Sequence, residues 1–125
     1  MVVIFIIYKE DRLYYLIGIV VINVQDRIKI AREFAESIKS KDINLIILFG
    51  SVARGEDTEE SDIDILIVSP IPREIRKRIN EKIVDIIVDK EEVISAHLMT
   101  DEHFNKTKEY PFLTNVLNEG VVLVQ

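Results

Sequence analysis

The sequence predicts one α/β or α+β domain with a central sheet and flanking helices, because helical and strand-like apolar patterns alternate along the chain. The chain has 125 residues, of which 48% are hydrophobic and 30% are charged. This length suits one hydrophobic core, and this composition is typical of a folded protein rather than a disordered one. We therefore expect a single domain over residues 1–125.

The alternation begins at Asn23. Apolar residues first recur at helical spacing, and short β-branched runs then separate further helical stretches. Pro72 suits the first turn of a helix. We expect a first helix that Asn23 or Asp26 caps and that continues to Ile38. In chain order there follow strands over 44–49 and 62–68, a helix over 72–81, a third core strand over 82–88, a helix over 89–98, a helical stretch from 101 to 119 interrupted at Pro111, and a strand over 121–124.

Residues 1–22 are predicted to form a β-hairpin appended to the core of residues 23–125. Val2–Tyr8 and Leu13–Ile22 are rich in β-branched and aromatic side chains, and a polar break separates them. An apolar hairpin outside a minimal core would expose adhesive surface. A homodimer formed through this hairpin is therefore a second interpretation, which the sequence leaves open.

Charge and composition exclude several classes of protein. The formal net charge is −6, which argues against binding of duplex nucleic acid over a broad basic face. Cysteine is absent, so the chain has no disulfide or thiolate metal site. The uncharged run Leu13–Ile22 is shorter than the roughly 20 residues of a membrane-spanning helix. Its preceding charges are mixed in sign, unlike a signal peptide, and we expect a cytoplasmic protein without a membrane segment.

Gly50 and Ser51 directly follow a predicted strand. Glycine allows a sharp turn and a close approach to a ligand. If Ser51 opens a helix, its amide and hydroxyl are placed to bind phosphate oxygens, and Arg54 lies one turn further along. Such pairs are also common in ordinary turns, so these residues by themselves are weak evidence of a nucleotide site.

Asp62 and Asp64 stand two residues apart on a predicted strand. Residues with this spacing point to the same face, so the two carboxylates lie side by side. Unpaired neighbouring carboxylates repel each other and raise each other's pKa. A divalent cation resolves this conflict, because Mg²⁺ prefers carboxylate oxygens and keeps other positions for water and phosphate.

A third acid is expected on a neighbouring strand, and Asp85 and Asp89 are the candidates. Asp89 precedes a predicted helix and has Glu92 three residues later, which is typical of a structural N-cap. Asp85 lies within the apolar run, where an unpaired charge would be costly. We therefore assign the third metal-ligating acid to Asp85.

The segment Leu48–Val68, with its string GSVARGEDTEESDIDILIV, resembles the minimal nucleotidyltransferases of the DNA polymerase beta-type superfamily. Residues 82–89 match more weakly as the strand of the third acid, and both ends of the chain lie outside the motif. The resemblance implies a nucleotidyltransferase fold with a mixed central sheet. It also implies transfer of a nucleoside monophosphate, expected to be AMP from ATP, with two Mg²⁺ ions.

The same resemblance implies a role for each residue. Gly50 and Ser51 would hold the terminal phosphates, aided by Arg54. Asp62, Asp64 and Asp85 would be the catalytic and metal-binding acids.

Many minimal nucleotidyltransferases resemble antitoxins that transfer AMP to a tyrosine of a HEPN-type toxin partner, and this family analogy predicts such a partner here. The alternative is a catalytically inactive module that binds a nucleotide or a partner and neutralises a toxin by contact alone.

Overall fold

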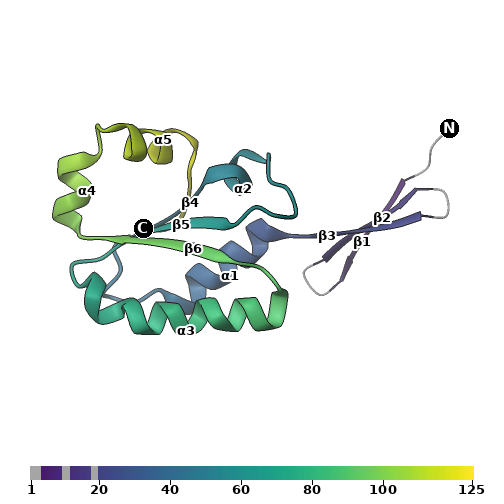
Figure 1. Cartoon of the computed structure of the whole chain (residues 1–125), viewed down its shortest axis with the longest axis horizontal. Coiled ribbons are helices and arrows are strands. Elements are labelled where there is room, and N and C mark those ends of the chain that lie inside the picture. The colour runs from purple at the N-terminus through teal and green to yellow at the C-terminus, as the bar shows by residue number, and fades with distance from the viewer. Residues whose placement is uncertain (1–3, 10–11, 18–19) are drawn as a thin grey trace.

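The computed structural model describes residues 4–9, 12–17 and 20–125, and describes side chains from residue 26 onward. Its centre is a four-stranded sheet in the order β6-β5-β4-β7. Strands β5 and β6 are parallel, whereas β4 runs antiparallel to both β5 and β7. The predicted mixed sheet flanked by helices is confirmed (Figure 1). The strands are β4 (Leu45–Phe49), β5 (Ile63–Val68), β6 (Ile94–Met99) and β7 (Val121–Val124).

Alternation along β5 divides the core between the two faces of this sheet. Ile63, Ile65 and Ile67 belong to one apolar cluster, which α1 (Arg27–Ile38) and α3 (Pro72–Lys90) cover. Leu66 and Val68 belong to a second, smaller cluster on the opposite face. There α5 (Pro111–Glu119) contributes Leu113 and Val116, and α4 (Asp101–Thr107) contributes Phe104. In Figure 1, α1 and α3 accordingly lie on one side of the sheet and α4 and α5 on the other.

The helix ends agree with local capping rules. The Asp26 carboxylate accepts a hydrogen bond from the Lys29 amide at 3.1 Å, so Asp26, one of the two predicted caps, is the N-cap of α1, which begins at Arg27. Thr100 caps α4 in the same way through the His103 amide. Pro111 stands at the first turn of α5, where its missing N–H has no cost, and separates α5 from α4.

Strands β1 (Ile4–Lys9), β2 (Arg12–Ile17) and β3 (Val20–Gln25) form a separate antiparallel sheet. Strands β1 and β2 pair as the predicted hairpin requires, but the predicted second strand Leu13–Ile22 is divided between β2 and β3, and β3 continues past residue 22 to Gln25. Residues 1–3, 10–11 and 18–19, which the hairpin prediction also included, lie outside the described residues.

The predicted strand over residues 82–88 is wrong, because this segment is the second half of α3. Its β-branched composition suits a strand, but its isoleucines continue the helical spacing that begins at Ile75. Ile83 and Ile86 pack partly buried against the first apolar cluster, whereas Val84 and Val88 are 56% and 73% exposed. Packing of one helical face onto the sheet therefore prevails over local propensity.

The predicted helix over residues 89–98 is also wrong. Glu91, with φ +57°, ends α3 in the left-handed conformation, and Ile94–Met99 then pairs in parallel with β5. Strand β5 is buried in the middle of the sheet, so its backbone groups need hydrogen-bonded strands on both sides. Strand β6 supplies the partner that residues 82–88 were predicted to supply.

Among the described residues, none of the helices has both the length and the apolar character needed to cross a bilayer.

Candidate active site

Gly50 turns the chain at the end of β4 and touches the carboxylate of Asp64. Its φ is +75°, which disfavours side chains, and a Cβ built there would lie 2.3 Å from Asp64 Oδ2. The same residue begins the short helix α2 (Gly50–Arg54). The predicted phosphate-binding turn and the predicted metal-binding acid are thus in direct contact.

Asp62 and Asp64 lie at the start of β5, on the sheet face opposite to the buried Ile63 and Ile65. Asp62 is exposed and Asp64 is half-buried. Burial raises the pKa of the Asp64 carboxyl, and the charge of Asp62 raises it further. His97 and Arg54 act in the opposite direction. The pair of acids therefore repels an additional negative charge and favours a bound cation.

Ser51 is half-buried in the first turn of α2, and Arg54 stands exposed at its end. The Arg54 guanidinium donates hydrogen bonds at 3.0 Å to Glu56 and to Glu119, and these bonds raise its pKa above the usual value. Arg54 thus connects α2 to the end of α5. A nucleotide phosphate at this position would have to compete with the two glutamates.

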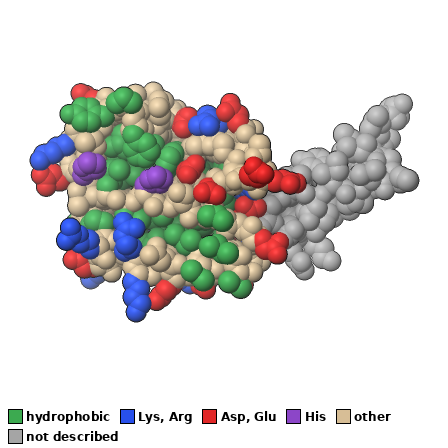
Figure 2. All heavy atoms as spheres, viewed as in Figure 1, with side chains coloured by type: hydrophobic (Ala, Val, Ile, Leu, Met, Phe, Trp, Pro, Cys, Tyr) green, Lys and Arg blue, Asp and Glu red, His purple; other side chains and the backbone are tan. Residues whose placement is uncertain are grey.

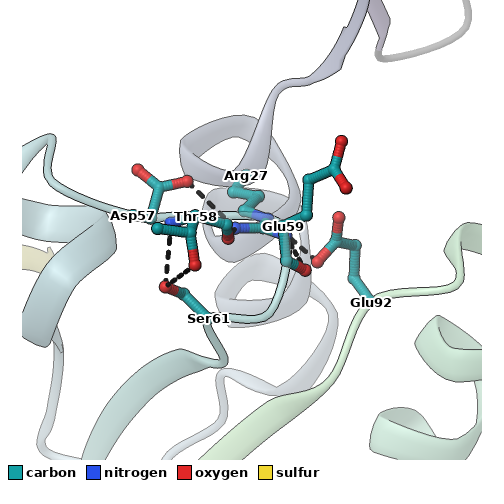
Figure 3. A network of polar contacts seen from close by, with 6 residues as sticks. All are labelled: Arg27, Asp57, Thr58, Glu59, Ser61 and Glu92. Atoms are coloured by element: carbon teal, nitrogen blue, oxygen red, sulfur yellow. Dashed lines mark hydrogen bonds and ion pairs between the residues drawn. The ribbon is translucent and has the colours of Figure 1, made fainter.

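The loop that leads from α2 to Asp62 is held by one arginine (Figure 3). Arg27 donates to Glu92 and Asp57 at 3.0 Å each, and also to the carbonyl oxygens of Thr58 and Glu59. Its side chain and that of Glu92 are each only 10% exposed. This acidic loop is therefore fixed to the start of α1 and to the residues before β6.

Asp85 lies away from Asp62 and Asp64, because α3 covers the other face of the sheet. It is exposed and lines an open groove of about 710 Å³ together with Arg73, Arg76 and Lys77. The expectation that placed it beside the acid pair depended on a strand over residues 82–88, and that strand does not form.

His97 lies beside the acids, and the sequence did not predict this position. It lies on β6 in register with Leu66, so it shares the sheet face of Asp64, and its charge acts on Asp64. Its ring centroid is 5.4 Å from that of Phe49 and 5.7 Å from that of Phe112. The alternation of side chains along the segment ISAHLM could have placed His97 on this face, but only if the segment had been predicted as a strand.

The acids and the three rings occupy one face of the molecule. Figure 2 shows both histidines on this face, with apolar side chains around them and acidic side chains close by. Phe112 is 44% exposed, whereas Phe49, which it contacts edge-on, is 8% exposed. Tyr110, the residue before α5, is 63% exposed. Phe112 of α5 therefore leaves an exposed aromatic surface beside His97, whose charge acts on Asp64.

The residues of the site fit a magnesium ion that arrives with a nucleotide. Mg²⁺ is commonly bound by one or two carboxylates together with substrate phosphates and waters. Asp62 and Asp64 supply two carboxylates beside the turn at Gly50. Across the described part of the chain, no group of three or more His, Cys, Asp or Glu side chains is arranged to hold a metal by itself.

The chain belongs to the nucleotidyltransferase domain family, whose profile matches residues 28–123. It is 43% identical over 98 residues to Methanocaldococcus jannaschii MJ0604, which is named as a proposed protein adenylyltransferase, and that match covers 76% of this chain and 95% of the relative. A second relative of the same organism and the same proposed activity, MJ0141, is 36% identical over 75% of this chain and 95% of its own length.

Two solved structures are also similar. A toxin–antitoxin structure with AMP-PNP aligns over 73% of this chain and 67% of its own, with 18% identity and a TM-score of 0.49. A proposed nucleotidyltransferase of Sulfolobus solfataricus aligns over 75% of this chain and 76% of its own, with 21% identity and a TM-score of 0.43.

Proposed function

We propose that this nucleotidyltransferase moves AMP from ATP to a hydroxyl group of a protein, with Mg²⁺ as its cofactor. The observation that carries the proposal is the contact of Gly50 with the Asp64 carboxylate, because it brings the phosphate turn and the acids to one point. Protein as the acceptor is supported by the proposed activity of the two M. jannaschii relatives.

Each residue of the site has a distinct role. Gly50 and Ser51 would bind the β- and γ-phosphates through the turn and the hydroxyl. Arg54 ends the same short helix, and its charge acts on the neighbouring Asp64 carboxylate. Asp62 and Asp64 would hold the magnesium, which would neutralise negative charge on the phosphate oxygens when bound.

The reaction is a displacement at the α-phosphorus. The acceptor oxygen forms a bond to this phosphorus, the bond from the phosphorus to the bridging α–β oxygen breaks, and pyrophosphate leaves with that oxygen. The acceptor hydroxyl loses its proton to solvent. Catalysis in such transfers comes chiefly from positioning and charge stabilisation. The loop that Arg27 fixes before Asp62 supports the positioning.

The sequence resemblance extends the proposal to a partner. It makes the acceptor a tyrosine of a HEPN-type toxin, so that this chain acts as the antitoxin. It also leaves room for a homodimer through the N-terminal strands. Comparing the full chain with one that begins at Asp26 by analytical sedimentation tests the dimer, and an unchanged oligomeric state would remove it.

Transfer is tested with ATP labelled with ³²P at the α-phosphate, by following labelled protein and released pyrophosphate. Asp62→Asn and Asp64→Asn should each abolish transfer, as should removal of Mg²⁺ by EDTA. Asp85→Asn is the matched control, because it removes the same charge from the other face of the sheet. Transfer that survives in both Asp62→Asn and Asp64→Asn would refute the site.

The second candidate is a module that binds its partner without chemistry. An Asp62→Asn, Asp64→Asn double variant that still neutralises the partner would favour this candidate. The placement of Asp64 against the Gly50 turn, with Asp62 beside it, supports the first candidate, because adjacent carboxylates at a phosphate turn suit a metal ion that assists transfer.

A further inference from the structure

We infer that His97 and Phe112 form the acceptor subsite, and that a tyrosine side chain of the partner lies against them with its hydroxyl facing His97. This inference rests on the proposed function and adds the side of the sheet from which the acceptor approaches. It assigns roles to the exposed imidazole of His97 and the exposed phenyl ring of Phe112, which have no role in binding the phosphates or the metal.

The order of the strands determines the direction of approach. The phosphate turn follows β4, the acids lie on β5, and His97 lies on β6, so they succeed one another across the sheet. In displacement at phosphorus, the attacking and leaving oxygens lie roughly in line. If pyrophosphate leaves toward Gly50 and Ser51, the acceptor oxygen enters from the β6 side.

His97 is placed to meet an oxygen that enters there. It is exposed, it shares a face with Asp64, and it is close enough to Asp64 for the two charges to interact. Its imidazole offers one hydrogen-bond donor or acceptor at either ring nitrogen. Strand β6 holds the side chain, so its position does not depend on a flexible loop.

The neighbouring rings favour an aromatic acceptor over an aliphatic one. Phe112 packs edge-on against Phe49 at 5.6 Å and 87°, and lies tilted against His97 at 5.7 Å and 44°. Phe49 is buried and holds the other two rings, while Phe112 keeps 44% of its surface exposed. Aromatic pairs favour such offset and edge-on contacts, so an incoming phenol ring gains contact area while its hydroxyl stays polar.

The chain offers a sharp test because it contains only two histidines, His97 and His103. Their ring proton resonances are followed by one-dimensional NMR and assigned with His97→Asn and His103→Asn. The protein is first saturated with Mg²⁺ and AMP-CPP, an ATP analogue that cannot be cleaved between its α- and β-phosphates, with binding measured by calorimetry. N-acetyl-L-tyrosinamide is then added as the acceptor probe.

We expect the probe to move the His97 resonance and to leave that of His103 in place. N-acetyl-L-serinamide should move neither. Phe112→Ala should weaken the response of His97 at equal probe concentration, while Tyr110→Ala should weaken it less, because Tyr110 lacks a ring contact with His97 among the contacts of the described side chains.

Two results would overturn the inference while leaving the proposed function intact. One is tight binding of AMP-CPP with no response of His97 to the tyrosine probe. The other is a large shift of His97 on adding AMP-CPP alone with no further shift from the probe, which would assign the rings to the nucleobase. Failure of AMP-CPP and Mg²⁺ to bind would instead refute the proposed function itself.

Discussion

Among the side chains outside the site, Arg27 should contribute most to holding the site in place. It holds the acidic loop before Asp62 through Asp57 and two backbone carbonyls, and it pairs with Glu92 at 3.0 Å. Arg27→Met keeps much of the apolar stem and removes all of these bonds. The Glu92 carboxylate is then left buried without its partner.

The cost follows from the burial of the pair. Both side chains are 10% exposed, and removing one partner of a buried ion pair costs about 3–5 kcal/mol. Because a tenth of each side chain still meets water, we expect the lower end, about 3 kcal/mol. For a chain of this size, that corresponds to a fall in Tm of about 10 °C. The affinity for ATP with Mg²⁺ should also fall, because the loop no longer fixes Asp62.

Urea unfolding followed by circular dichroism measures the stability, and calorimetry measures nucleotide binding. Arg32→Met is the matched control, since Arg32 is exposed on the same helix. An Arg27→Met, Glu92→Leu double variant should be more stable than Arg27→Met alone, because it leaves no buried charge unpaired. A loss below about 1 kcal/mol for Arg27→Met, equal to that of Arg32→Met, would refute this reasoning.

Three further variants test the packing of the site. Gly50→Ala places a methyl group 2.3 Å from Asp64 Oδ2 at φ +75°, so it should cost about 2 kcal/mol in urea unfolding and abolish AMP transfer; full transfer would contradict the contact. Gly120→Ala meets the Val116 carbonyl oxygen at 2.3 Å and Ile47 at 2.5 Å, so it should cost a similar amount, about 2 kcal/mol, while folded protein transfers AMP normally. Asp64→Asn should raise Tm at pH 7 without Mg²⁺. Burial raises the pKa of Asp64, so the folded chain holds this proton more tightly than the unfolded chain. That contribution is complete at low pH and is lost as pH rises through the raised pKa. The Tm difference from the unsubstituted chain should therefore shrink on acidification, and a constant difference across pH would contradict it.

Much of the site could be predicted because it is local. Gly50 and Ser51 end one strand, and Asp62 and Asp64 share a face of the next by simple alternation, so short-range spacing was sufficient to place them. The strands 45–49 and 63–68 and the mixed sheet agree with the prediction for the same reason. The resemblance to the nucleotidyltransferases was predicted from this same segment, and the profile match over residues 28–123 confirms the family.

The identity of the strand beside the acids was decided only by the tertiary structure. Residues 82–88 have strand-like composition, yet Ile83 and Ile86 extend a helical stripe that covers the sheet. Which of two apolar segments pairs with β5 depends on contacts between residues far apart in sequence, and local propensity does not contain them. The alternation of side chains along a strand was therefore enough to predict from the sequence that Asp62 and Asp64 share one face. Long-range pairing moved Asp85 to the opposite face and brought His97 to the site.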